Sequence, residues 1–212
     1  MSMRKLFLLL VLLAGVFPAS AVTVDRIAAV LDRQVLTVSE VNQMVELRFF
    51  PRLVQTDDEH RREVLEALIA QALRYRDVER FGAQDIPADA IEARLQEIQG
   101  RFGSPEEFTA ALTRTELTLD EMRALVRRQL QVEAYIQERF APQVFVQTEE
   151  IEEYYRGPWT AQRRERGLAV PPLAQVQNEI RDALRSQRLQ TEIEHWTTQL
   201  RARANVDVYA WR

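Results

Sequence analysis

The sequence predicts a mainly helical fold, an irregular multi-helix core with a small β element. Three observations support this class. Apolar residues recur at helical spacing through most of the 212-residue chain. Several Ser or Thr residues precede a Glu by three positions, as in the capping boxes that start helices. Alternating apolar and polar residues occur near the two ends of the chain, and no fixed repeat period indicates a solenoid.

The first 21 residues have the features of a secretory signal peptide. Arg4 and Lys5 precede an apolar run over residues 6–16, which is shorter than the roughly 20 residues of a membrane-spanning helix. Ala19 and Ala21 occupy the small-residue positions of the cleavage site. We therefore expect cleavage after Ala21 and a periplasmic protein without stable membrane insertion, with a retained N-terminal anchor as the alternative.

The first elements after this leader are a hairpin and a helix. Residues 27–31 and 35–36 flank Asp32-Arg33-Gln34, which predicts a tight β-hairpin. Thr37 and Glu40 fit a capping box, so a first helix is expected over residues 38–50, ending before Pro51.

Four start or stop signals organise the next helices. A strongly periodic helix is predicted over residues 58–81, with Gly82 as its stop, and another begins near Pro87. Ser104 followed by Pro105 starts a further helix, and Thr118 with Glu121 forms a second capping box.

The remaining chain is predicted to hold a linker, one long helix and a strand. Residues 156–170 are polar, residues 172–204 would form a helix about 50 Å long, and residues 206–209 alternate. We expect the final strand to pair beside residues 27–31, so that the C-terminal segment packs on one common core. The expected divisions are a signal peptide (1–21), a helical core (22–155), a linker (156–170) and a C-terminal helix and strand (171–212).

The residues that could perform chemistry are few. The two histidines, His60 and His195, lie in charged helical stretches, which favours exposed positions. No histidine or carboxylate spacing fits a metal site, no serine lies in a nucleophile motif, and the chain has no cysteine. The 32 acidic residues exceed the 28 basic ones, which disfavours nucleic acid as a partner. We expect no catalytic activity, no metal and no cofactor.

Several segments, in this order, resemble the N-terminal core and C-terminal helix of SurA-type periplasmic chaperones. They comprise residues 28–41, 62–82, 104–112, 119–130, 149–155, 172–180 and 204–208. Members of that family usually insert one or two parvulin-type prolyl isomerase domains between the two parts, where this sequence has only residues 156–170. The resemblance therefore implies the chaperone core and does not extend to isomerase activity.

The resemblance implies binding of unfolded polypeptide, in particular aromatic-rich segments of outer-membrane protein precursors. The large flat or flexible apolar side chains are the candidate peptide contacts, with core packing as the alternative for each: Phe49, Phe50, Tyr75, Phe102, Met122, Tyr135 and Trp159. A holdase of this kind needs no ATP. The competing hypotheses are an adaptor or assembly subunit dedicated to one fixed partner and, last, a prolyl isomerase. The sequence does not predict the oligomeric state.

Overall fold

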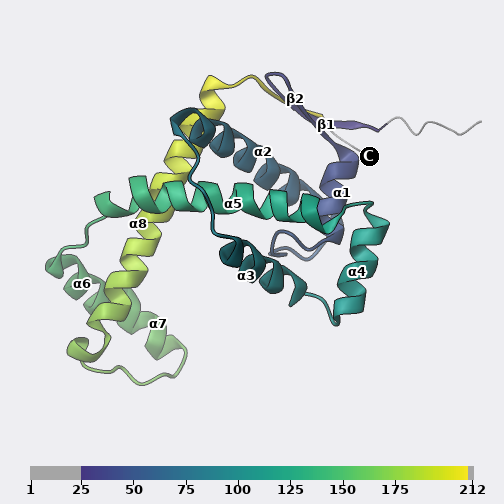
Figure 1. Cartoon of the computed structure of the whole chain (residues 1–212). Coiled ribbons are helices and arrows are strands. Elements are labelled where there is room, and N and C mark those ends of the chain that lie inside the picture. Colours follow the sequence, from purple (N-terminus) through teal and green to yellow (C-terminus); the bar gives the residue numbers. More distant parts are fainter. Residues whose placement is uncertain (1–24, 210–212) are drawn as a thin grey trace, which may run out of the picture.

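The structure is a computed structural model that describes residues 25–209. The predicted signal peptide and its cleavage residues, Ala19 and Ala21, lie outside the described residues. The described part is mainly helical and contains a three-stranded antiparallel sheet built from an N-terminal hairpin and a C-terminal strand (Figure 1). The predicted fold class is therefore confirmed.

The sheet joins the two ends of the described chain. Strands β1 (Ile27–Leu31) and β2 (Gln34–Thr37) form the hairpin, and β3 (Val206–Val208) pairs antiparallel with β1, giving the order β2-β1-β3. At the hairpin turn, the Asp32 N–H donates to the Asn205 carbonyl at 2.8 Å and the Asn205 N–H donates to the Asp32 carboxylate at 2.8 Å. The predicted pairing of the last strand with residues 27–31 is thus confirmed.

Helix α1 (Val38–Glu46) starts where the sequence predicts and ends earlier. Thr37 and Glu40 form the capping box, with the Thr37 N–H donating to the Glu40 carboxylate at 2.7 Å. The predicted end at residue 50 is wrong because Arg48 takes a left-handed conformation, with φ of 48°. The Phe49 N–H then donates back to the Met44 carbonyl at 3.0 Å, which closes the helix in a Schellman-type end.

Four helices complete the body of the molecule together with α1. They are α2 (Asp57–Phe81), α3 (Ala88–Gln99), α4 (Pro105–Arg114) and α5 (Leu119–Arg139). The side chains of Ser104 and Thr118 accept the N–H groups of Glu107 and Glu121, each at 3.2 Å, so both predicted start signals are confirmed. α5 packs against α2 and α3 and lies across the centre of the body (Figure 1).

The predicted linker is largely helical. After the short 3₁₀ helix η1 (Ala141–Gln143), α6 (Thr148–Tyr154) continues through a π turn, η2 (Tyr155–Trp159), into α7 (Thr160–Glu165). Pro158 has no N–H to donate inside this helix. The π turn accommodates Pro158, and the Thr160 hydroxyl donates to the Tyr155 carbonyl at 2.5 Å. Trp159 is buried and stacks on Tyr155 at 5.4 Å between ring centroids, which stabilises the helical path.

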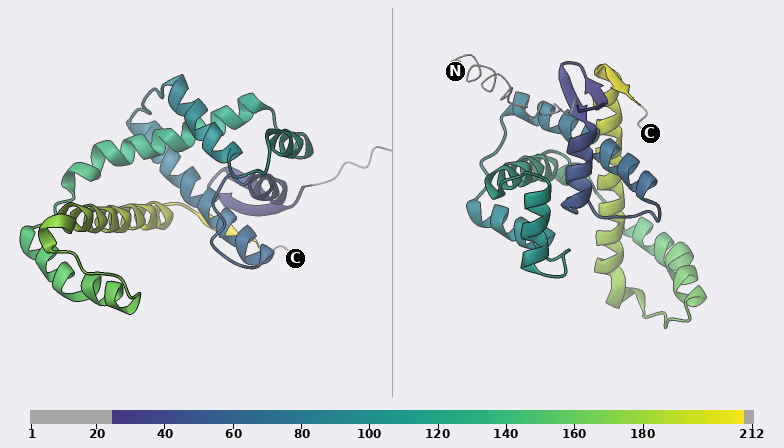
Figure 2. Two further views of the ribbon diagram at one scale, coloured as in Figure 1. Left: turned by 90° about the horizontal axis from the view of Figure 1, so that it is seen from below. Right: turned by 90° about the vertical axis from the view of Figure 1, so that its right-hand side faces the viewer.

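Helix α8 (Leu173–Arg203) connects two separate apolar clusters. Trp196 and Leu200, near its C-terminal end, are buried in the main core with the sheet and helices α1 to α5. Val176 and Ile180, near its N-terminal end, pack with Ile151 and Trp159. We call α6, η2, α7 and residues 173–184 of α8 the arm; Figure 2 shows that it extends away from the body.

The C-terminal half of α8 packs on the main core as predicted, whereas its N-terminal half belongs to a second apolar cluster and not to one common core. With 31 residues, α8 is about 46 Å long and reaches past the body that covers its C-terminal half. Its N-terminal half needs a second partner, which the helix over residues 148–165 supplies. Among the helices of residues 25–209, none combines the length and apolarity needed to cross a membrane.

Candidate binding pocket

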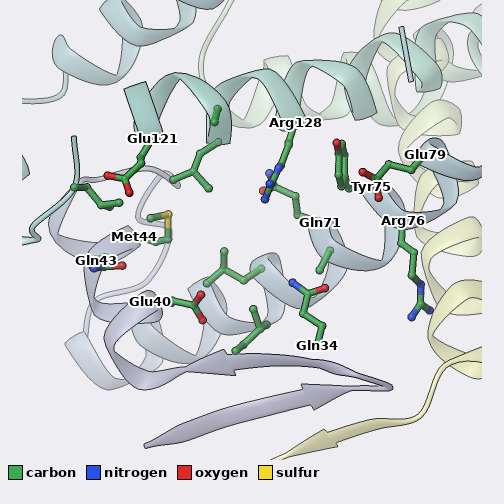
Figure 3. Close-up of a pocket in the computed structure, with 16 residues that line it drawn as sticks. Gln34, Glu40, Gln43, Met44, Gln71, Tyr75, Arg76, Glu79, Glu121 and Arg128 are labelled. Carbon is green, nitrogen blue, oxygen red and sulfur yellow. The ribbon is translucent and has the colours of Figure 1, made fainter. Parts of the chain in front are cut away.

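A pocket of about 590 Å³ lies between β2, α1, α2 and α5 (Figure 3). This volume is within the roughly 300–1,000 Å³ that is typical of ligand sites. Its apolar lining consists of Leu36, Met44, Leu68, Ala72, Tyr75, Leu117, Ala124 and Leu125. Its polar lining consists of Gln34, Glu40, Gln43, Gln71, Arg76, Glu79, Glu121 and Arg128.

Regular spacing brings these side chains to one place. On α5, residues 121, 124, 125 and 128 follow the i, i+3, i+4, i+7 pattern of a single helix face. On α2, residues 68, 71, 72, 75, 76 and 79 do the same, and on α1 the lining residues are 40, 43 and 44. Gln34 and Leu36 are two apart on β2 and so lie on the same face of the sheet. The pocket is thus the space that three helix faces and one strand leave unfilled.

Two of the three pocket carboxylates are already used in helix caps. Glu40 accepts the Thr37 N–H, and Glu121 accepts the Thr118 N–H at 2.8 Å and its hydroxyl at 2.7 Å. The backbone N–H of Thr118 is the largest cause that holds the pKa of Glu121 below its usual value. Glu121 therefore stays ionised at neutral pH and contributes fixed negative charge at the rim.

The remaining rim is formed by two arginines and the groups beside them. Arg76 forms an ion pair with Asp32 at the hairpin turn. The guanidinium of Arg128 lies 5.5 Å from the centroid of the Tyr75 ring. Desolvation, followed by the neighbouring Glu79 carboxylate, raises the pKa of Tyr75 above its ordinary value. Tyr75 thus remains a neutral hydroxyl at the edge of an apolar floor.

The structure places the predicted peptide contacts in different environments. Tyr75 lines the pocket, and Phe50 is partly buried against the main core. The other five are buried, four in the main core and one in the arm: Phe49, Phe102, Met122, Tyr135 and Trp159. The four aromatic ones pack on other rings, as Phe102 does on Phe108 at 5.4 Å and Tyr135 on Trp196 at 5.5 Å between ring centroids. The structure therefore brings only one of the seven into this pocket.

Sequence reasoning did not single out the aliphatic lining. Leu68 and Leu125 are partly buried and line the pocket, and Met44 lines it too. Met122, which the sequence suggested as a candidate peptide contact, is fully buried. The sequence signal that could have identified the aliphatic lining is a helix face on which leucines alternate with charged residues. Leu125 shares such a face with Glu121 and Arg128. Aromatic content alone did not indicate them.

The exposed position expected for His60 is wrong. His60 is 5% exposed, because it lies one turn before the core residue Val64 on the inner face of α2, and its Nδ1 has no hydrogen-bond partner. His195 is exposed, as expected, and its ring lies 3.1 Å from the Gln199 side chain. Within residues 25–209, no group of three or more His, Asp or Glu side chains could hold a metal ion.

Comparison with known proteins finds distant similarity to Chaperone SurA from several bacteria. The chain is 29% identical over 149 residues to Chaperone SurA of Pseudomonas aeruginosa, which covers 68% of this chain and 36% of that protein. It is 30% identical over 149 residues to Chaperone SurA of Alkalilimnicola ehrlichii, covering 67% of this chain and 34% of that protein. No protein-family profile matches the chain. The chain spans about a third of the length of these curated relatives, so the similarity concerns only part of them.

Proposed function

We propose that the chain is an ATP-independent periplasmic chaperone that holds non-native polypeptide, with the pocket between β2, α1, α2 and α5 as its binding site. The observation that most supports this proposal is the pocket itself, an apolar floor of aliphatic side chains and Tyr75 within a charged rim. The distant similarity to Chaperone SurA also supports a chaperone-like role.

The chemistry of the pocket suits varied clients. Leucine and methionine side chains contact apolar groups of many shapes without requiring one geometry. Three glutamates and two arginines at the rim keep an apolar opening soluble. The floor contains no reactive thiol or serine, so the site offers binding and no evident covalent chemistry.

The finer parts of the proposal rest on the sequence. Precursors of outer-membrane proteins are the proposed clients, because the resemblance to SurA-type chaperones implies them and the leader predicts export. Mass spectrometry of the exported protein should find Val22 at the N-terminus. Absence of prolyl isomerase activity belongs to the same proposal, and a protease-coupled prolyl peptide assay should show no acceleration over background.

The direct test is suppression of aggregation by the full mature chain with several unrelated unfolded clients. A Leu68→Gln, Leu125→Gln double variant should protect clearly less, since it makes the pocket floor polar. Leu53→Gln is the matched control because Leu53 is 80% exposed and lies outside the pocket. Melting temperatures of both variants separate loss of binding from loss of folding.

Two results would change the proposal. Equal protection by the wild type and a folded double variant would move the binding site away from this pocket. Protection of one client alone would favour the competing hypothesis of an adaptor dedicated to a fixed partner.

A further inference from the structure

The polar groups of the pocket differ in whether the protein already uses them. Glu40 and Glu121 accept hydrogen bonds in helix caps, Gln43 donates to the Thr115 carbonyl at 2.9 Å, and Arg76 pairs with Asp32. These groups shape the pocket and have part of their bonding capacity filled.

Two carboxamides are different. The side chains of Gln34 and Gln71 form no hydrogen bond with any other group in residues 25–209. Gln71 is half-buried on α2, and Gln34 extends from the edge strand β2 (Figure 3). They therefore come from two different walls and are both available to a bound molecule.

A carboxamide has the same hydrogen-bonding groups as a peptide bond, a carbonyl acceptor and N–H donors. It can therefore pair with the main chain of any residue, whereas a charged group would select ligands of the opposite charge. An unfolded segment that enters an apolar pocket loses water from its peptide groups, and unpaired buried peptide groups are costly. Free carboxamides beside the apolar floor offset this cost by forming hydrogen bonds with the peptide groups, whatever side chains the segment carries.

We propose that Gln34 and Gln71 hydrogen-bond the main chain of an extended client segment, while the aliphatic floor holds its apolar side chains. This inference rests on the proposed function and specifies the chemistry of its ligand. Recognition then depends on main-chain N–H and C=O groups together with general apolarity, and little on the order of side chains.

The test uses the full mature chain and a fluorescein-labelled ten-residue peptide of alternating Leu and Ser, measured by fluorescence anisotropy. A second peptide has the same side chains with alternate peptide nitrogens methylated, which removes N–H donors. The protein variants are wild type, Gln34→Ala with Gln71→Ala, and Gln187→Ala. Gln187 is the matched control, an exposed glutamine on α8 outside the pocket.

The wild type and Gln187→Ala should bind the methylated peptide about tenfold more weakly than the parent peptide. This factor corresponds to two lost hydrogen bonds, each of which weakens binding about fivefold or less. The double variant should bind the parent peptide about tenfold more weakly, with little further loss on methylation. An equal methylation penalty in all three proteins would overturn the inference, because methylation would then act on the peptide alone. If the wild type binds neither peptide, the proposed function itself fails at this pocket.

Discussion

Replacement of Trp196 by alanine is the sharpest test of how the C-terminal helix is held. Trp196 is 8% exposed, and its ring centroid lies 5.5 Å from that of Tyr135 and 5.2 Å from that of Phe140. Its indole N–H donates to the Asp77 carboxylate at 3.2 Å. One side chain of α8 thus contacts α5 and the segment that follows it, and bonds to α2.

The expected effect follows from these contacts. Truncation of a buried Trp to Ala costs about 3–5 kcal/mol of unfolding free energy, because the ring leaves a cavity. For a domain of this size each kcal/mol lowers the melting temperature by about 2–4 °C. Trp196→Ala should therefore melt about 6–20 °C lower than the wild type. Trp196→Phe should lower the melting temperature less, because it keeps an aromatic ring in the core, although it removes the hydrogen bond to Asp77.

Thermal unfolding followed by circular dichroism at 222 nm measures the change. Phe145→Ala is the matched control, because Phe145 is 75% exposed and should shift the melting temperature little. If Trp196→Ala melts within 2 °C of Phe145→Ala, roughly the smallest shift that 1 kcal/mol produces, the C-terminal helix is not part of the main core and the reasoning fails.

Two further predictions concern the arm and the hairpin turn. Trp159→Ala should loosen the arm and speed tryptic cleavage within residues 148–184, while lowering the main melting transition less than Trp196→Ala does; equal shifts would contradict two separate clusters. The pKa of Asp32 lies below its usual value, first because the Asn205 N–H bonds its carboxylate and next because of Arg76. Its contribution to stability is therefore present above about pH 4, the unfolded value, and is lost as the pH falls through the lower folded pKa. Asp32→Asn should accordingly be less stable than the wild type at pH 7 and approach it near pH 2 in urea unfolding, whereas a constant difference across this range would show that the charge is not responsible.

Local signals predicted the helix starts well because each depends on a few neighbouring residues. Thr37, Ser104 and Thr118 each cap a helix through the predicted side-chain bond. The pairing of β3 with β1 was also predictable. A single alternating segment needs a partner strand for its backbone hydrogen bonds, and the N-terminal hairpin was the other β element that the sequence predicted. These are cases in which the chemistry of a few residues leaves one good solution.

The wrong predictions arose where tertiary contacts override local preference. Arg48 takes a left-handed conformation, and its guanidinium bonds the Arg101 carbonyl and the Glu107 carboxylate, with an Arg48–Glu107 distance of 2.8 Å. These distant partners stabilise a helix end that contains no glycine. The polar residues 156–170 similarly suggested a linker, but burial of Trp159 stabilises a helix through Gly157 and Pro158.

The pocket could not be predicted from the sequence. Apolar residues at helical spacing show which side chains face the interior, but they do not show whether a neighbouring element fills the space in front of those side chains. Met44 and Met122 both lie on inward faces, yet Met44 borders the pocket and Met122 is covered completely. The difference depends on the space that neighbouring elements leave between them, as β2, α1, α2 and α5 do beside Met44. That separation is a property of the assembled fold.

The assembled fold also connects the C-terminal segment to a pocket that no residue of α8 lines. Asp32 bonds Asn205, which follows α8, and pairs with Arg76, which lies at the pocket rim. Gln34 lies two residues after Asp32 and forms the β2 wall. Loss of the Asp32 contacts should therefore loosen this wall as well as the sheet. Because Asn205 directly precedes β3, we expect its bonds to Asp32 to form together with the pairing of β3 on β1, so that removal of the C-terminal strand should loosen the β2 wall of the pocket.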